Sequence, residues 1–223
     1  NVIDRETDLL RMMETQMQAL PSNDSKEKTL LEEWNLSITP VNNEKELRQI
    51  KRHMGHSADC FSKAFRVKNS NRDNAFWNYY DKHNYHKEDI HYWYHGSRNM
   101  NCLSILHNGL ILNPKAPKVG HMFGYGIYLA PKAKKSIGYT SLNGSFWVHG
   151  TSDTAYLFVM KTVYKSPYHV YTWTSGMKSL TKSRISPHDA VFAHAGTSLR
   201  NDEVVIFDDA QVTLQYIIEL KQQ

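Results

Sequence analysis

The spacing of hydrophobic residues changes along the chain, from helical spacing near the N-terminus to strand-like runs further on. Between Asp4 and Leu20, leucines and methionines recur every three or four positions, which predicts an amphipathic helix. A polar stretch follows this segment. We therefore expect residues 1–30 to form a helix and a linker, as the remnant of a larger helical region, and residues 31–223 to form the main domain.

A second helix is predicted after Asn43. This residue and Glu46 have the three-residue spacing of an N-cap and its partner. Hydrophobic residues then follow on one stripe, at Leu47, Ile50 and Met54. The polar residues 66–74 predict a loop, and the aromatic-rich residues 90–96 predict a strand.

The middle of the chain mixes short elements. Residues 101–108 predict a short helix that ends at Gly109. Two prolines within residues 113–120 predict an irregular loop. Hydrophobic and aromatic runs predict strands at residues 155–163 and 169–173.

The C-terminal pattern is the clearest. Residues 203–207 predict a strand, and Asp208 and Asp209 predict a turn. Every second position from Val212 to Leu220 is hydrophobic, which predicts a half-buried strand. Helices come mainly before strands, without a regular β-α-β alternation, so the sequence predicts an α+β fold.

Composition narrows the class of protein. A chain of 223 residues suits one domain, and 40% hydrophobic with 22% charged residues excludes a disordered chain. No run of 18 apolar residues occurs, so we expect no membrane association. Cys60 and Cys102 have no metal-binding spacing, which favours a reducing, intracellular environment. Because the sequence starts at Asn1 rather than Met, we expect it to be part of a longer chain.

Two segments combine side chains that are typical of ligand sites. Residues 95–98, HGSR, directly follow the aromatic strand. Between Gly120 and Ser141, glycines that let a backbone approach a planar ligand alternate with tyrosines that can stack on a ring. The GxGxxG spacing of hydride-transfer domains is absent. Taken alone, the glycine-tyrosine segment fits an ordinary turn equally well, and a single histidine after a strand is more often structural.

Metal and nucleic-acid sites have weaker support. Two histidine pairs, His83 with His86 and His91 with His95, have helical spacing, but no third ligand accompanies either pair, so we expect no metal. The net charge of +5 would suit a polyanion, and plain nucleic-acid binding stays open as a function.

Three motifs in a fixed order resemble the catalytic domain of the poly(ADP-ribose) polymerase family: HGSR at 95–98, GHMFGYGIY at 120–128 and NDEVVIF at 201–207. The resemblance covers Trp34 to Lys221 and is strongest to the nuclear, DNA-damage-responsive branch. It implies an ADP-ribosyltransferase fold with split, mostly antiparallel sheets and flanking helices. It also implies that NAD+ is a substrate rather than a permanently bound cofactor, and that ADP-ribose passes to protein acceptors.

The family's catalytic triad falls on His95, Tyr128 and Glu203. By resemblance, His95 binds a ribose hydroxyl on the adenosine side and Tyr128 lines the nicotinamide slot. Glu203 accepts a hydrogen bond from the nicotinamide ribose, stabilises the cationic transition state and orients the incoming hydroxyl.

The remaining NAD+ contacts are transferred in the same way. Gly96 and Ser136 are expected to bind the carboxamide, and Tyr139 to stack on the nicotinamide ring. Four further positions match the family: Ser97 and Asn101 at the adenosine ribose, Lys135 beside the triad, and Met122 on the acceptor side. Glu203 with Met122 is compatible with chain elongation and also with single transfers.

Four positions depart from the family pattern. Tyr94 replaces a tryptophan, His121 replaces a tyrosine, and Pro131 replaces an acidic residue. Ile111 stands where an arginine helps to bind adenosine. The alternative function is a catalytically silent module that binds NAD+ or ADP-ribose as a scaffold. We expect a nuclear location, with the cytoplasm as the alternative, and a link to nucleic acid only through other domains.

Overall fold

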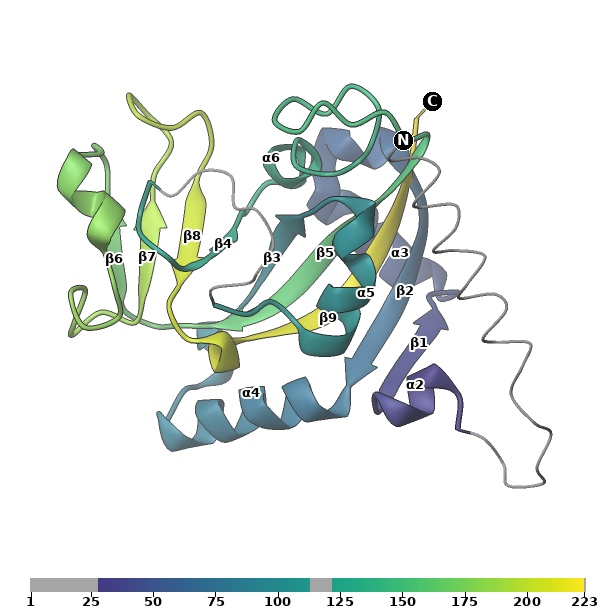
Figure 1. Ribbon diagram of the computed structural model, residues 1–223, viewed down its shortest axis with the longest axis horizontal. Coiled ribbons are helices and arrows are strands. Elements are labelled where there is room, and N and C mark those ends of the chain that lie inside the picture. Colours follow the sequence, from purple (N-terminus) through teal and green to yellow (C-terminus); the bar gives the residue numbers. More distant parts are fainter. Residues whose placement is uncertain (1–27, 113–121, 223) are drawn as a thin grey trace, which may run out of the picture.

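The structure is a computed structural model that describes residues 28–112 and 122–222. Within these ranges the chain forms two sheets, in the orders β1-β2-β9-β5-β3 and β4-β8-β7-β6 (Figure 1). All neighbouring strands are antiparallel except β6 and β7. The predicted α+β class with split, mostly antiparallel sheets is confirmed. The helix expected between Asp4 and Leu20 and the loop expected at 113–120 lie outside the described residues.

The strands are β1 (Leu36–Pro40), β2 (Phe61–Asn69), β3 (Ile90–Gly96), β4 (Ile127–Leu129), β5 (Thr154–Val163), β6 (Pro167–Val170), β7 (Ala190–Ala193), β8 (Glu203–Ile206) and β9 (Val212–Lys221). The α-helices are α2 (Leu30–Glu33), α3 (Glu44–Met54), α4 (Ser70–Lys82), α5 (Cys102–Asn108) and α6 (Ala133–Ile137). Short 3-10 turns are η1 (Gly55–Cys60), η2 (Lys87–Asp89), η3 (Asn99–Asn101), η4 (Ser175–Ser179) and η5 (Asp209–Gln211).

The two sheets meet where β3 passes the end of β4. The backbone N–H of Tyr94 donates to the carbonyl of Ala130, and the N–H of Ala130 donates back to Tyr94, both at 2.9 Å. This pair of hydrogen bonds fixes the end of β3 against the end of β4. We call it the sheet seam.

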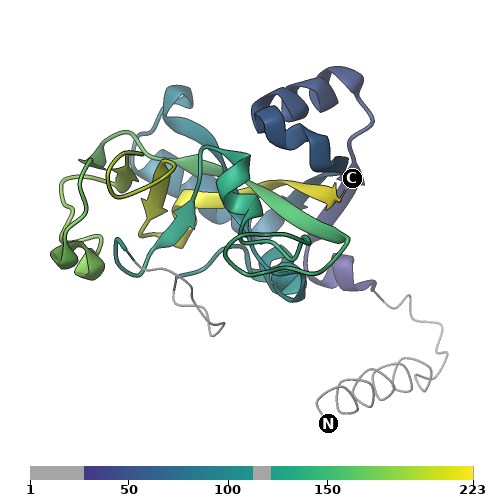
Figure 2. The same cartoon turned by 90° about the horizontal axis from the view of Figure 1, so that it is seen from above.

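Separate hydrophobic clusters cover the two faces of the five-stranded sheet. On one face, Phe158 and Met160 of β5 pack with Ile105 of α5 and with strands of the second sheet. On the other face, Leu157 of β5 packs with Ile50 of α3. Figure 2 shows α3, in dark blue, on one side of this sheet.

Several local sequence signals are confirmed. The side chain of Asn43 accepts a hydrogen bond from the backbone N–H of Glu46 at 3.0 Å, as an N-cap of α3 should. The predicted short helix exists as η3 and α5, and Gly109 ends it. The strands expected at 90–96, 155–163 and 203–207 are β3, β5 and β8.

The loop prediction for residues 66–74 is wrong. Strand β2 runs to Asn69, and α4 begins at Ser70. The Asn69 side chain accepts from the N–H of Arg72 at 3.1 Å and donates to the carbonyls of Leu106 and His107 at 2.9 Å. The polar residues are therefore the cap and first turn of a helix, because capping residues are the same types that favour loops.

The prediction that β9 is a half-buried strand, with its alternate hydrophobic residues on one face, is also wrong. Val159 pairs with Tyr216 and Met160 pairs with Leu214, so Gln215 is an extra, bulged residue. Leu214 consequently joins the cluster under α5, whereas Ile218 joins the cluster under α3. Residues that alternate in the sequence thus lie on opposite faces, and the strand is buried on both. The bounds expected for the strand at 169–173 are wrong, since β6 begins at Pro167 and ends at Val170.

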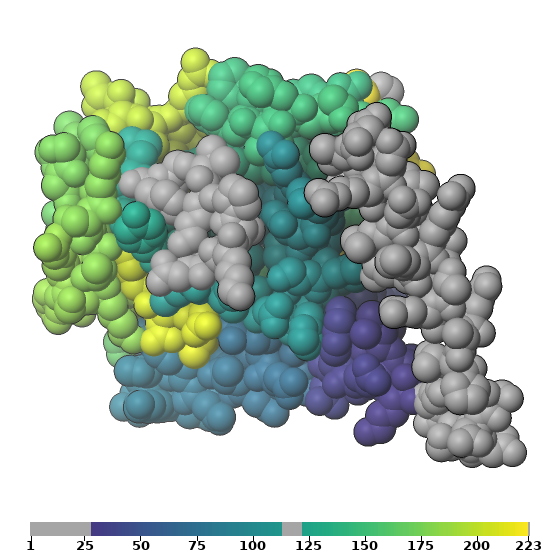
Figure 3. Space-filling view, viewed as in Figure 1, coloured from purple at the N-terminus to yellow at the C-terminus, as the bar shows by residue number. Residues whose placement is uncertain are grey.

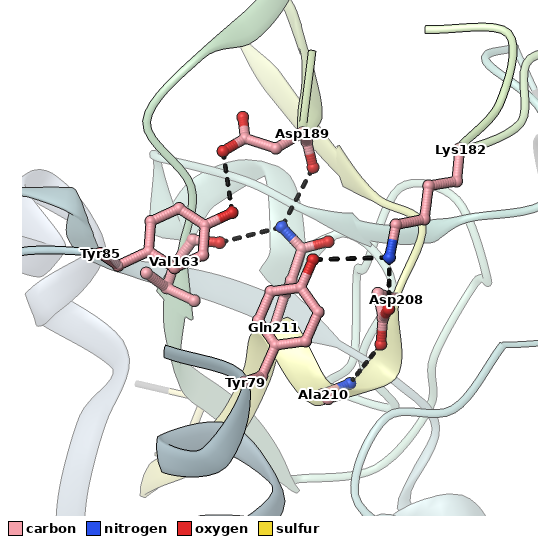
Figure 4. A network of polar contacts seen from close by, with 8 residues as sticks. All are labelled: Tyr79, Tyr85, Val163, Lys182, Asp189, Asp208, Ala210 and Gln211. Atoms are coloured by element: carbon pink, nitrogen blue, oxygen red, sulfur yellow. Dashed lines mark hydrogen bonds and ion pairs between the residues drawn. The ribbon is translucent and has the colours of Figure 1, made fainter. Parts of the chain in front are cut away.

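A polar network packs the second sheet against α4 and η5 (Figure 4). Asp189 accepts a hydrogen bond from the Tyr85 hydroxyl at 2.9 Å, and the buried Gln211 amide donates to the carbonyls of Val163 and Asp189 at 3.0 Å. Lys182 contacts Asp208 at 2.6 Å. These contacts hold the long connection between β6 and β7 in place.

Candidate active site

Three strands bring the predicted triad to the sheet seam. His95 follows Tyr94 on β3, Tyr128 is on β4, and Glu203 begins β8. Tyr128 pairs across the sheet with Val205, and Glu203 lies two residues before Val205. Because every second side chain of a strand points to the same face, Tyr128 and Glu203 share a face as diagonal neighbours.

The imidazole of His95 is oriented by the backbone of β4. Its Nδ1 lies 3.0 Å from the carbonyl oxygen of Tyr128. A carbonyl can only accept, so Nδ1 bears the proton and Nε2 keeps a lone pair. Burial lowers the pKa of His95 below its usual 6.5, and the carbonyl contact opposes that shift only in part. His95 is therefore a neutral hydrogen-bond acceptor at Nε2 near neutral pH.

The phenol of Tyr128 is held by the preceding turn. Its hydroxyl donates to the carbonyl of Gly124 at 2.7 Å and accepts from the N–H of Phe123 at 3.0 Å. Burial raises the pKa of Tyr128, the hydrogen bond from Phe123 opposes the rise, and the charge of Glu203 adds to it. The hydroxyl is thus protonated, and it fixes the shape of the segment before β4.

Glu203 forms an ion pair with Lys135 of α6. The Lys135 Nζ lies 2.9 Å from Oε1, and each side chain is only 11% exposed. Burial raises the pKa of Glu203 above its ordinary 4.5, and the ammonium charge and hydrogen bond of Lys135 oppose that rise. A carboxylate in this setting binds a proton more readily than an exposed one does.

The expected carboxamide residues lie against each other. A Cβ on Gly96 would be 1.7 Å from the carbonyl oxygen of Ser136, so no side chain fits at position 96. Ser136 is buried, and its carbonyl accepts from the N–H of Tyr139 at 3.0 Å. Burial, with a contribution from the charge of Glu203, raises the pKa of Tyr139 to about 12. Gly96, Ser136 and Tyr139 are therefore neighbours of the triad.

Ser97 and Asn101 are also adjacent. The Asn101 amide donates to the Ser97 hydroxyl at 2.9 Å. Two residues that the sequence did not single out hold this segment: the N–H of Asn99 donates to the Ser141 hydroxyl at 2.9 Å, and the Asn99 amide donates to the carbonyl of Thr154. Their common residue types gave no signal in the sequence.

Met122 lies on the side of the second sheet, apart from the Gly96 group. Its carbonyl accepts from the indole of Trp173 at 2.7 Å, and its side chain packs with Phe123 and the β7–β8 cluster. One further aromatic residue was missed. Trp147 stacks against Tyr139, with ring centroids 5.8 Å apart and an 18° angle between planes. Two adjacent aromatic residues, Phe146 and Trp147, in a glycine-containing loop were the available signal.

Of the departures from the family pattern, the structure explains Tyr94 and locates Ile111 and Pro131. Tyr94 is buried, and its hydroxyl lies 2.7 Å from Nδ1 of His53 on α3, so the smaller ring gains a polar partner. Ile111 is 38% exposed, and Pro131 lies in the bend between β4 and α6. His121 lies outside the described residues.

Two cavities have linings that include none of the triad residues. One of about 270 Å³ is lined by Ile50, His53 and Tyr94, between α3 and the sheet. Another, of about 470 Å³, is lined by Arg66, Trp77 and Lys161. Among residues 28–112 and 122–222, no group of three or more His, Cys, Asp or Glu side chains is placed to hold a metal ion. In the same ranges, no helix is both long and apolar enough to cross a bilayer.

Comparison with known proteins defines the class to which this fold and site belong. The family model of the poly(ADP-ribose) polymerase catalytic domain matches residues 44–222. The chain therefore belongs to the poly(ADP-ribose) polymerase catalytic-domain family.

Individual relatives share only modest sequence identity with this chain. A "Poly [ADP-ribose] polymerase" of Drosophila melanogaster is 31% identical over 147 residues, which is 57% of this chain and 15% of the relative. "Poly [ADP-ribose] polymerase 1" of Gallus gallus is 31% identical over 153 residues, or 57% of this chain and 14% of the relative. "Poly [ADP-ribose] polymerase 2" of Arabidopsis thaliana is 25% identical over 225 residues, or 85% of this chain and 34% of the relative. The match thus spans a small part of each relative.

Proposed function

We propose that this domain is an NAD+-dependent ADP-ribosyltransferase. In the proposed reaction the bond between nicotinamide and the ribose C1′ breaks, and its electron pair leaves with a neutral nicotinamide. A nucleophilic group of a protein acceptor then bonds to C1′ and loses its proton. NAD+ is consumed as a substrate, and no permanently bound cofactor is required.

The observation that most supports this proposal is the clustering at the sheet seam. An imidazole, a phenol and a carboxylate from β3, β4 and β8 lie around the contact between His95 and the Tyr128 carbonyl, next to the Lys135–Glu203 ion pair. Bond cleavage develops positive charge on the ribose. A buried carboxylate can stabilise that charge, because its field is weakly screened there.

Each triad residue has a role that its local chemistry permits. His95, neutral with a free lone pair at Nε2, accepts a hydrogen bond from a ribose hydroxyl of the adenosine part. Glu203 accepts from the nicotinamide ribose and takes the acceptor's proton, for which a raised pKa is an advantage. Tyr128 lines the nicotinamide slot as an oriented, protonated phenol.

The surrounding residues complete the NAD+ site. In this proposal Gly96 and Ser136 bind the carboxamide, Tyr139 stacks on the nicotinamide ring, and Ser97 with Asn101 contacts the adenosine ribose. Lys135 holds Glu203 in position, and Met122 lies toward the acceptor. Single transfer and chain elongation are both compatible with this arrangement.

The test is incubation of the purified chain with NAD+ labelled in its adenylate part, together with candidate acceptor proteins. We expect label on protein and one free nicotinamide for each NAD+ consumed. On a denaturing gel, a discrete band indicates single transfer and a smear indicates a polymer. Calorimetric binding of NAD+ without nicotinamide release would support the silent scaffold module instead and reject the enzyme.

The biological setting is a separate proposal. We propose protein acceptors and a nuclear location, with any contact to nucleic acid made by parts of the protein outside this domain. Imaging of the tagged full-length protein tests the location. Salt-dependent DNA binding by the isolated chain, insensitive to nicotinamide, would favour direct nucleic-acid binding. The division at residue 30 also stays a prediction, which limited proteolysis tests.

A further inference from the structure

The connection between α6 and β5 contains a compact loop with its own hydrogen bonds. The N–H of Asn143 donates to the carbonyl of Ser152 at 2.8 Å, and the N–H of Ser152 donates to the carbonyl of Ser141 at 2.9 Å. Inside the loop, the buried Ser145 hydroxyl accepts from the N–H of Gly150 at 2.8 Å. Residues 141–152 thus form a loop whose conformation is fixed by internal hydrogen bonds.

Trp147 joins this loop to the end of α6. The backbone N–H of Trp147 donates to the carbonyl of Gly138 at 2.9 Å, and a Cβ at position 138 would lie 2.9 Å from the indole Cδ1. Glycine at 138 is therefore what admits the indole at this distance. The next residue in the chain is Tyr139, whose ring stacks on the indole with centroids 5.8 Å apart.

The contacts continue to the segment that precedes Glu203. Phe146 meets Trp147 edge to face at 4.7 Å and 88°, and the Arg200 guanidinium lies 5.8 Å from the centre of the Phe146 ring. Arg200 lies just before β8, which begins at Glu203. The series Tyr139, Trp147, Phe146 and Arg200, which we call the aromatic bracket, links α6 to the strand that bears the carboxylate.

Two rings of the aromatic bracket are largely exposed to solvent. Trp147 is 48% exposed and Phe146 is 60% exposed, so neither side chain is explained by burial in the core. A ring that is held on one face by a parallel neighbour loses much of its rotational freedom before a ligand arrives. Preorganisation of this kind lowers the entropic cost of binding.

We propose that Trp147 is a positioning residue for NAD+, which acts by holding the ring of Tyr139 in the orientation that stacks on nicotinamide. This inference rests on the proposed function, because it takes Tyr139 as the nicotinamide-stacking residue. It goes further by assigning binding strength to a residue of the 141–152 loop. The effect is on ground-state binding and leaves the bond-breaking step unchanged.

The experiment compares the wild-type chain with Trp147→Ala and Trp147→Phe. We expect Trp147→Ala to raise both KM for NAD+ and Kd for free nicotinamide roughly two- to tenfold, the range set by one aromatic pair, with little change in kcat. Trp147→Phe keeps a stacking ring and should restore most of the affinity. The matched control is Trp77→Ala, at a tryptophan of α4 that is 40% exposed. Helix α4 lies across the molecule from α6 (Figure 1).

The outcomes separate this inference from the proposed function. Unchanged KM and Kd in Trp147→Ala, with an active wild type, overturn the positioning role alone. Equal losses in Trp147→Ala and Trp77→Ala, or a loss that follows the fall in Tm in every variant, overturn it as well. If the wild type binds nicotinamide but releases none from NAD+, the enzyme proposal fails while the Kd comparison still tests Trp147. A wild type that binds neither molecule rejects both.

Discussion

Lys135 and Glu203 form a nearly buried ion pair, with 2.9 Å between Nζ and Oε1 and 11% exposure of each side chain. The two residues come from α6 and β8, elements that are far apart in the chain. Removing one partner leaves the other charge in a poorly solvated place, which costs more than the pair contributes when intact. Both the stability and the pH response of the domain should therefore depend on this contact.

The first prediction concerns Lys135→Met. Without the ammonium, only burial acts on Glu203, so its pKa should rise further above 4.5. A carboxyl group whose pKa is higher in the folded than in the unfolded state does not lower the free energy of unfolding at pH values below the unfolded-state pKa. It lowers that free energy increasingly as the pH rises from the unfolded-state pKa to the folded-state pKa. We expect the free energy of unfolding to fall by about 3 kcal/mol near neutral pH and by much less at about pH 4. Chemical denaturation at both pH values measures this.

The exposed neighbour Lys134 provides the control for that experiment. Lys134→Met should change stability by less than about 0.5 kcal/mol at either pH. Equal losses for the two variants, or a loss in Lys135→Met that is independent of pH, would show that the ion pair does not control the titration of Glu203.

The second prediction concerns Glu203→Gln. The amide keeps the shape of the side chain but cannot stabilise positive charge or take a proton. We expect the transfer rate to fall about 10²- to 10⁴-fold, with Kd for nicotinamide within about threefold of wild type. Quantified label transfer and calorimetry measure the two effects. Glu88→Gln, at an exposed site, is the control, and indistinguishable rates for Glu203→Gln and wild type would refute the role of Glu203.

The third prediction concerns the protonation of His95. Its pKa is lowered by burial, so the imidazole should stay neutral throughout the range above its usual 6.5. Protonation would convert Nε2 from an acceptor to a donor. KM for NAD+ should therefore be flat above that pH and rise only in more acidic solution. In His95→Gln the KM should be higher than that of wild type above pH 6.5 and should lose the acidic rise. The control is His56→Gln, at an exposed site, which should keep the wild-type profile.

The fourth prediction concerns Tyr128→Phe. This change removes the hydroxyl that bonds the N–H of Phe123 and the carbonyl of Gly124. Leaving these groups without the hydroxyl should destabilise the domain by about 1–3 kcal/mol. Thermal unfolding should show a Tm lower by several degrees, of the order of 2–4 °C for each kcal/mol at this size. Tyr171→Phe, at a side chain that is 67% exposed, should leave Tm unchanged.

The sequence predicted elements whose signal is local. The cap of α3 and the glycine after α5 are read within a few residues, and β3 and β5 are hydrophobic enough to identify alone. The bulge at Gln215 is not visible locally, because it depends on the register between β9 and β5. Likewise, Asn69 looks like a loop residue until its contacts with α4 and the end of α5 are known.

The candidate site was likewise predictable from the sequence only in part. Family motifs pointed to the residues of the triad, and the structure places them at the sheet seam. The ion pair of Lys135 with Glu203 and the stack of Trp147 on Tyr139 required the folded chain. Charge complementarity and ring orientation depend on distances that spacing in one dimension does not contain.

The sheet seam bears on how such a domain changes over evolutionary time. The spacing between the strands of His95 and Tyr128 depends on the peptide groups of Tyr94 and Ala130 and on the carbonyl of Tyr128. Nearly every amino acid supplies these groups, proline excepted for the N–H. The backbone pairing of β3 with β4 can therefore persist while many neighbouring side chains change. Sequence divergence should then accumulate at exposed side chains, such as those of Phe146 and Trp147 in the 141–152 loop, rather than at the seam.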